Sequence, residues 1–285
     1  MVFLARGANL DALRRGSLVI ESVDGDFRVA CPHATDTLAG AAPVALALVA
    51  AKSYDTAAVA AAIAPVVAPE TIVLSLQNGV ENESLLAAVL RLPPLLGAMT
   101  HVSAELVAPG VVRHTAEGAI FFGELDGRES ARTRALAALL TGAGVAHRAS
   151  RDILLRLWDK LAWNAAHNAV TALTRRTAGA AAADPTAGAL IGDAMHEVGA
   201  VARAQGIGLD AARVERTLAF SRAHMRGVRT SMLQDVERGR RLEHEALNGA
   251  VVRLGAAVGV ATPVNRVLYG LLAALDAGRA AAAAG

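Results

Sequence analysis

The sequence has 285 residues and 54% of them are hydrophobic, so it can bury the core of one large domain or of two ordinary ones. The formal net charge is only +2, with basic and acidic residues interspersed, so the composition gives no reason to expect a nucleic-acid partner. The single cysteine, Cys31, excludes an internal disulfide and fits a reducing compartment, and no group of Cys and His residues has the spacing of metal ligands.

The N-terminal segment predicts a short strand, a short helix and a hairpin. A brief apolar run suggests the strand, and Gly16 ends the helical pattern after it. Asp24-Gly25 is typical of a hairpin turn between two further strands. The expected elements are a strand at residues 2–5, a helix at 8–14, and hairpin strands at 18–21 and 27–31.

Two continuous apolar runs follow, at residues 44–50 and 71–76, as is typical of parallel strands covered on both faces. An alanine-rich helix that starts at Asp55 is expected between them. The first run ends next to Lys52 and the second next to Asn78. Because ligands bind outside the carboxyl ends of parallel strands, both side chains are candidates for ligand binding. The alternatives are a surface lysine and an ordinary Asn-Gly turn.

The most apolar stretch of the chain, residues 38–51, is too short to span a bilayer and is interrupted by Gly40 and Pro43. The N-terminal residues lack the basic-then-apolar pattern of a signal peptide. We therefore expect a soluble cytoplasmic protein with no membrane partner.

The alternation of strands and helices predicts a parallel α/β sheet up to about residue 150, and only helices after it. This places a domain boundary near residue 150 and gives domains at 1–150 and 151–285. In the first domain, further short strands are expected at residues 95–100, 111–113, 119–122 and 145–148, with a helix at 129–140. In the second, helices are expected at residues 153–173, 185–205, 210–223, 230–239, 242–258 and 263–277.

The helix expected at residues 153–173 has a polar stripe. Lys160, Asn164 and Asn168 recur every four residues, so at about 100° per residue they share one face of the helix. Both tryptophans of the chain, Trp158 and Trp163, flank the lysine, which suggests that the stripe is half-buried. The alternative is a solvated helix face.

The scarcity of lysine favours a functional role for this stripe. Of 28 basic residues, only Lys52 and Lys160 are lysines. Arginine cannot give up its proton near neutral pH, whereas a partly desolvated lysine can, so Lys160 is a candidate general acid with a lowered pKa. Asn164 and Asn168 are mediocre helix formers, and two of them one turn apart suggest selection for something other than helix stability.

The later helices offer polar candidates of lower specificity. Ser231 is a candidate in a polar segment, and the alternative is that it is an ordinary residue at the start of a helix. Glu243 lies on the next helix together with other polar residues, and a solvated face is the alternative there.

These pieces occur in the order and spacing of the ketopantoate reductases (2-dehydropantoate 2-reductases), and the sequence resembles that family from residue 2 to about residue 270. The lysine-asparagine helix and the Ser-Met-Leu-Gln-Asp segment are the most specific parts of the resemblance. The matching segments are Ala51-Lys52-Ser53-Tyr54, Leu76-Gln77-Asn78-Gly79-Val80, Ser103-Ala104 before Pro109-Gly110, the segment from Trp158 to Asn168, Ser231-Met232-Leu233-Gln234-Asp235, and Glu243 with Asn248-Gly249.

The resemblance implies an NADPH-dependent reduction of a 2-oxo acid, most simply of ketopantoate to pantoate in pantothenate and coenzyme A biosynthesis. It implies that Lys160 gives a proton to the substrate carbonyl oxygen, and that Glu243 contacts the substrate hydroxyl or the cofactor. The remaining substrate residues would be Asn164, Asn168 and Ser231. The residues that would line the NADPH site are Arg6, Lys52, Asn78 and Ala104, with Arg6 at the 2′-phosphate.

The sequence also departs from the family. The family begins with a strand and a Gly-x-Gly-x-x-Gly turn ahead of the Arg6 position, and these are absent here, so the expected fold is an N-terminally truncated Rossmann-like parallel sheet domain followed by an all-α domain. Two family asparagines are missing at Ala178 and Val228. These departures leave open the 2-oxo acid that is used.

The missing turn suggests that the 285-residue chain binds NADPH weakly, and the unpaired edge of strand 2–5 favours aggregation or a homodimer. A non-catalytic remnant of the family, acting as a binding or interaction protein, is the alternative function. The joint presence of Lys160, Asn164, Asn168 and Glu243 favours descent from a working enzyme.

Overall fold

The computed structural model describes residues 1–284, with side chains up to residue 279. The chain forms two compact units, an α/β unit and a helical unit. The α/β unit contains Met1–Ala50, Ala57–Leu76 and Glu83–Ile153, and the helical unit contains Ala51–Thr56, Gln77–Asn82 and Leu154–Gly285. Two short segments that follow strands of the α/β unit are therefore part of the helical unit.

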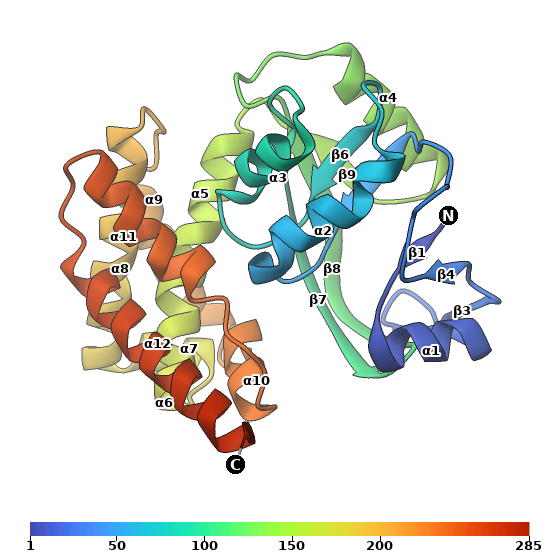
Figure 1. The fold of residues 1–285 in the computed structure, drawn as a ribbon. Helices are drawn as coiled ribbons and strands as arrows, with labels where there is room; N and C mark the ends of the chain where they lie inside the picture. The colour runs from blue at the N-terminus through green and yellow to red at the C-terminus, as the bar shows by residue number, and fades with distance from the viewer. Residues whose placement is uncertain (285) are drawn as a thin grey trace. The chain divides into compact units, whose positions relative to one another are not determined.

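The α/β unit contains three groups of paired strands (Figure 1). β1 (Phe3–Leu4) pairs in parallel with β4 (Ala34–Thr35), and β5 (Leu46–Val49) pairs in parallel with β6 (Ile72–Ser75). The largest sheet has the order β3-β2-β8-β7, with β9 (His147–Ala149) also paired to β8. Its β2 (Ser17–Ser22) and β3 (Phe27–Ala30) form the predicted hairpin, and β2 and β9 run parallel to β8. The predicted α/β class is confirmed, with antiparallel pairs added to the parallel ones.

The prediction of short strands between residues 95 and 122 was wrong. The structure has one long antiparallel pair, β7 (Gly97–Ala108) and β8 (Val111–Gly123), joined by a turn at Gly110 with φ of +77°. The buried ends of these strands are apolar and were recognisable, but their outer halves are largely exposed or half-buried and mix polar with apolar residues. Pairing between the two strands, rather than burial, extends them there.

The core of the α/β unit forms where helices cover these strands. Leu74 of β6, Phe122 of β8 and Leu136 of α4 are fully buried in one cluster. Burying a side chain of this size contributes about 1.5 to 3 kcal/mol. The helices are α1 (Gly7–Arg15), α2 (Thr56–Ile63), α3 (Asn82–Leu90) and α4 (Ala131–Gly142), with short 3₁₀ turns at Ser53–Asp55 and Ala64–Val66.

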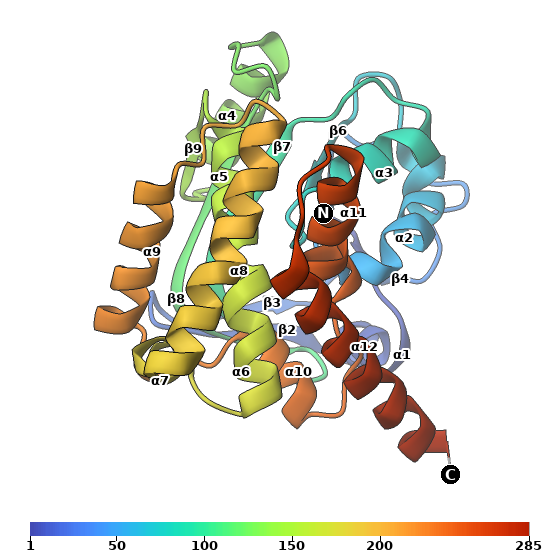
Figure 2. The same cartoon turned by 90° about the vertical axis from the view of Figure 1, so that its left-hand side faces the viewer.

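The helical unit has no strand between Leu154 and Ala284, as predicted. Its helices are α5 (Ile153–Trp163), α6 (Ala169–Thr174), α7 (Ala178–Ala183), α8 (Pro185–Ala204), α9 (Ala211–His224), α10 (Ser231–Glu237), α11 (Ala250–Ala257) and α12 (Pro263–Ala284). The helix α7 was not predicted, because its sequence is almost entirely alanine and glycine and has no amphipathic pattern. Its neighbours α8 and α9 pack side by side (Figure 2).

The ends of the helices are fixed by side chains that the sequence supplies. Asp184 accepts hydrogen bonds from two backbone N–H groups at the start of α8, where Pro185 occupies the first turn. Asp210 caps α9 and Thr230 caps α10 in the same way. Each cap contributes about 0.5 to 2 kcal/mol. The core beneath these helices includes Met195 and Val198 of α8, which are fully buried.

Both helices expected at residues 153–173 and 242–258 contain a π-helical turn. The first helix is interrupted by its π turn, whereas the second begins with its π turn at Glu245. The expectation that Glu243 lies on this second helix was therefore wrong, because Glu243 precedes it. We call Asn164–Asn168 the first π segment and Glu245–Gly249 the second π segment. The N–H of Gly249 donates to the carbonyl oxygen of His244, which is the i→i+5 bond that defines a π turn. Such turns have no distinct sequence pattern, so periodicity could not separate them from the flanking α-helix.

Candidate active site

The helix α5 places Lys160 at the border between buried and exposed surface. Its apolar face, with Trp158 and Leu161 buried in the core of the helical unit, fixes the helix there. Burial lowers the pKa of Lys160 to about 8, and the nearby carboxylate of Glu243 opposes that shift. The lowered pKa that lysine scarcity suggested is therefore found in the structure.

The polar stripe continues into the first π segment, so its geometry differs from the α-helical spacing that predicted it. Asn164 is 7% exposed and Asn168 is 1% exposed. The solvated-face alternative is wrong for both side chains. A π turn takes more residues per turn than an α turn, so the step of about 100° per residue does not hold between them.

Asn168 is buried without a hydrogen-bond partner. Neither its side-chain oxygen nor its side-chain nitrogen is bonded to any of the described residues. An unsatisfied buried amide costs about 1 to 3 kcal/mol, which is a reason to look for a ligand that satisfies it. The Nε2 of His167, in the same segment, is also buried without a hydrogen-bond partner among the described residues.

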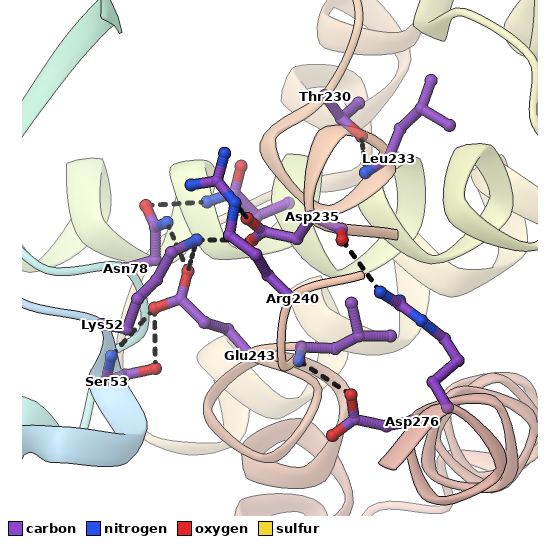
Figure 3. Close-up of polar contacts among 12 residues, drawn as sticks. Lys52, Ser53, Asn78, Thr230, Leu233, Asp235, Arg240, Glu243 and Asp276 are labelled. Atoms are coloured by element: carbon purple, nitrogen blue, oxygen red, sulfur yellow. Dashed lines mark hydrogen bonds and ion pairs between the residues drawn. The ribbon is translucent and has the colours of Figure 1, made fainter. Parts of the chain in front are cut away.

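Glu243 is the centre of a buried polar cluster (Figure 3). It is 5% exposed, and its Oε1 accepts hydrogen bonds from both the backbone N–H and the hydroxyl of Ser53, each at 2.9 Å. Its Oε2 lies 3.2 Å from the Nζ of Lys52 and 3.4 Å from the Nδ2 of Asn78. The solvated-face alternative for Glu243 is wrong, because the side chain is enclosed by donors.

Lys52 is held by two carboxylates. Its Nζ lies 2.5 Å from the Oδ2 of Asp235 and 3.2 Å from Glu243. Burial acts to lower the pKa of Lys52, but Glu243 and Asp235 outweigh it and raise the pKa above its ordinary value. Lys52 is therefore a fixed cation, whereas Lys160 can lose its proton near neutral pH.

Asn78 links Glu243 to the first π segment. Its Nδ2 faces Glu243, and its Oδ1 accepts from the Nδ2 of Asn164 at 3.4 Å. The structure thus brings together five of the predicted site residues in the helical unit. They are Lys52, Asn78, Lys160, Asn164 and Glu243.

Ser231 lies at the first residue of α10 and is exposed. This position agrees with the alternative that Ser231 is an ordinary helix-start residue, and the helix cap is Thr230, which accepts a hydrogen bond from the N–H of Leu233 (Figure 3). Thr230 also hydrogen-bonds to the hydroxyl of Thr171 at 2.7 Å.

Two site residues were missed by the sequence analysis. Asp235 is 4% exposed and binds Lys52, and Ser53 binds Glu243 through two hydrogen bonds. A signal was present for Asp235, because a carboxylate occupies the buried face of α10 beside Met232 and Val236. No local signal marks Ser53, whose partner is 190 residues away.

The remaining predicted residues belong to the α/β unit. Arg6 is exposed and lies between β1 and α1, with an extended backbone and no side-chain bond that caps the helix. Ala104 is exposed on β7, opposite His114 of β8. Among residues 1–284, no group of His, Cys, Asp and Glu side chains could hold a metal ion, and no helix is long and apolar enough to cross a membrane.

Comparison with known proteins accounts for most of the chain. Residues 1–127 match the family described as "Ketopantoate reductase PanE/ApbA", and residues 152–276 match "Ketopantoate reductase PanE/ApbA C terminal". A 2-dehydropantoate 2-reductase from Archaeoglobus fulgidus is 36% identical over 98% of this chain and 90% of its own length.

Solved structures agree with the sequence matches. The crystal structure of a PanE/ApbA family ketopantoate reductase from Ralstonia eutropha JMP134 has a TM-score of 0.88 and 32% identity, over 98% of this chain and 91% of that chain. The crystal structure of 2-dehydropantoate 2-reductase from Geobacter metallireducens GS-15 has a TM-score of 0.87 and 32% identity, over 95% of this chain and 90% of that chain.

An α/β unit, a helical unit and a buried lysine–carboxylate cluster, together with these matches, define an oxidoreductase. The chain belongs to the ketopantoate reductase family, and the resemblance found in the sequence is confirmed.

Proposed function

We propose that this protein reduces ketopantoate to pantoate with NADPH, as a step of pantothenate and coenzyme A biosynthesis. The observation that carries the proposal is Lys160, whose pKa burial lowers to about 8 beside the fixed carboxylate of Glu243. A proton donor is most useful when its pKa lies close to the working pH. The non-catalytic alternative is not favoured, because it gives no reason for a buried ionisable lysine next to buried amides.

Each residue of the site has a role in this proposal. Lys160 gives its proton to the carbonyl oxygen of the substrate, and its positive charge stabilises negative charge that develops on that oxygen. Asn164, Asn168 and Ser231 hold the substrate, and the unsatisfied amide of Asn168 supports its part in this set. Glu243 contacts the substrate hydroxyl or the cofactor.

The β1–α1 connection fits the 2′-phosphate of NADPH. The first turn of α1 contains no acidic residue, so its N–H groups and the positive end of the helix dipole favour an anion there. Arg6 immediately precedes this turn and can pair with a phosphate. Lys52, Asn78 and Ala104 would line the rest of the cofactor site, and NADPH, when bound, would supply a hydride to C2 of the substrate.

The proposed domain roles are a nucleotide-binding domain at 1–150 and a substrate and dimerisation domain at 151–285. The expected homodimer and the cytoplasmic location stay predictions. Measuring the molecular mass in solution would decide the first, and imaging the protein in cells would decide the second.

Steady-state turnover tests the proposed function directly. We expect NADPH oxidation in the presence of ketopantoate, with kcat/KM at least about tenfold above that for the analogue that has hydrogen in place of the hydroxyl, because a buried polar site discriminates against a substrate that leaves it unpaired. Equal values for the two acids would contradict ketopantoate as the substrate. Because weak binding of NADPH is expected, the assay is run at saturating NADPH, and absence of turnover with both acids under that condition would favour the non-catalytic alternative.

Replacing Arg6 with alanine is expected to raise the Michaelis constant for NADPH by about tenfold to a hundredfold and to leave that for NADH almost unchanged. A charge-assisted hydrogen bond is worth about 1.5 to 3 kcal/mol, and only NADPH carries the 2′-phosphate that would accept it. Arg14→Ala on the same helix is a matched control, since Arg14 is committed to Asp36. Equal losses for the two cofactors would show that Arg6 is structural.

A further inference from the structure

A side-chain hydrogen bond joins the two π segments. The Nδ2 of Asn248, in the second π segment, donates to the carbonyl oxygen of Ala165, in the first, at 2.9 Å. Asn248 is fully buried. Within the first π segment the N–H of Ala169 donates to Ala166 and not to Ala165. In an α-helix the N–H of Ala169 would donate to the carbonyl oxygen of Ala165. Here Asn248 donates to that oxygen instead.

The side-chain amide of Asn248 is also hydrogen-bonded to α12, which is in turn hydrogen-bonded to α8. The Nδ2 of Asn248 also donates to the Oδ1 of Asn265 at 3.0 Å. The Nδ2 of Asn265 donates to Glu197 at 2.8 Å and to the carbonyl oxygen of Ala194 at 3.0 Å. Asn248 and Asn265 each donate two hydrogen bonds from their side-chain amide. The direction of every hydrogen bond in the series from Glu197 to Ala165 is therefore fixed.

Glu197 anchors this chain of hydrogen bonds at the start of α12. Its two carboxylate oxygens accept the backbone N–H groups of Val264 and Asn265 at 2.8 and 2.9 Å. A carboxylate at a helix N-terminus is stabilised by the unpaired N–H groups and by the helix dipole. The anchor joins α8 to α12 before the chain of hydrogen bonds reaches the first π segment.

This arrangement carries a cost that a purely structural contact would avoid. The Oδ1 of Asn248 is buried and has no hydrogen-bond partner among the described residues. A leucine of similar volume would remove this unsatisfied oxygen, but it would also remove the donor to the Ala165 carbonyl and to the Oδ1 of Asn265. The retained amide suggests that the bond to the Ala165 carbonyl has a use beyond packing.

The function of the hydrogen bond from Asn248 to the Ala165 carbonyl can be inferred from the side chains of the first π segment. Asn168 has no protein partner among the described residues, so its direction depends on the backbone that carries it. We propose that Glu197, Asn265 and Asn248 form a positioning chain that fixes this backbone through the Ala165 carbonyl, and thereby aims Asn168 at the substrate. The aiming step rests on the proposed function, whereas the fixing of the backbone does not.

Hydrogen exchange tests the fixing of the backbone without any need for turnover. In Asn248→Ala, exchange of the backbone amides in Asn164–Asn168 should be at least about tenfold faster than in the unmodified full chain. The matched control is Val251→Ala, which opens a cavity at a fully buried residue of α11 but removes no hydrogen bond. Asn265→Ala is the second variant, because it cuts the chain of hydrogen bonds while leaving the donor to Ala165 in place.

The proposal is overturned if Val251→Ala, at equal loss of global stability, accelerates exchange in Asn164–Asn168 as much as Asn248→Ala does. If Asn248→Ala fails to fold, Asn265→Ala decides, and exchange no faster than in the control overturns the proposal. Absence of turnover by the unmodified chain would count against the proposed function alone, since the exchange experiment still gives its answer.

A double-mutant cycle tests the aiming of Asn168. Asn248→Ala should lower kcat/KM for ketopantoate at least about tenfold, mainly through KM. In an Asn168→Ala background, where the aimed side chain is gone, the same change should cost less than about threefold. Losses that simply multiply in the double variant would show that Asn248 does not act through Asn168.

Discussion

Replacing Lys160 with methionine is expected to lower kcat by about 10² to 10⁴-fold with ketopantoate and NADPH, the usual contribution of a general acid. Methionine fills much the same space but has no proton to donate. The loss should appear in kcat more than in KM, because the proton is needed on the way to the transition state. A loss smaller than about tenfold would remove Lys160 from the role of general acid.

The pH dependence of this activity has a defined sign. Because burial lowers the pKa of Lys160 to about 8, the protonated form is lost as the pH rises through about 8, and activity should fall there. Lys160→Arg is the matched control, since it keeps the positive charge but cannot release its proton near neutral pH. It should stay inactive across the range in which the unmodified protein loses activity.

Stability provides a second readout for the same substitution. The pKa of Lys160 is below its ordinary value of 10.5, so the unfolded chain binds more protons between about pH 8 and 10.5, and stability rises with pH over that window. Lys160→Met should therefore keep or raise the thermal midpoint at pH 7 while it lowers turnover. A large fall in the midpoint would mean that lost folding, rather than lost chemistry, explains the inactivity.

Replacing Glu243 with glutamine is expected to lower both stability and turnover. Its carboxylate accepts two hydrogen bonds from Ser53 and pairs with Lys52, and a glutamine amide would place N–H groups against these donors. A hydrogen bond to a charged group is worth about 1.5 to 3 kcal/mol. Because Lys52 keeps Asp235, we expect a loss of about 2 kcal/mol in the free energy of unfolding, measured with urea.

The same variant should move the pH profile in a direction that a general loss of structure would not give. Glu243 raises the pKa of Lys160 against the effect of burial, so without this charge the pKa should fall below about 8 and the loss of activity should begin at lower pH. Glu245→Gln is the matched control, because this nearby carboxylate is exposed and bonded to Arg253 and Tyr269. Identical profiles for the two variants would contradict the assigned role of Glu243.

Much of this site could be predicted because its composition is unusual. Lys160 stands out in an arginine-rich chain, and Lys52 and Asn78 directly follow apolar runs that form β5 and β6. The pairing of Lys52 with Asp235 could not be predicted, because it joins residues 183 positions apart and depends on tertiary packing.

The same distinction between local sequence pattern and tertiary context explains which parts of the fold could be predicted. Strands and helices with a buried face were recognisable from their periodicity, including α8 and α9, whose starts were predicted to within one residue. The outer halves of β7 and β8 were missed because pairing rather than burial stabilises them. The two π segments were missed because the same residue types would form an ordinary helix in another context.

The helical unit is not a contiguous stretch of sequence, and this limits how the chain can be divided by engineering. The two short segments Ala51–Thr56 and Gln77–Asn82 supply Lys52, Ser53 and Asn78, the donors around the Glu243 carboxylate. A C-terminal fragment that begins after residue 150 would retain the Glu243 carboxylate but lose Lys52, Ser53 and Asn78. A chimera that exchanges helical units between relatives must therefore carry both segments with it, as a graft of three pieces rather than one.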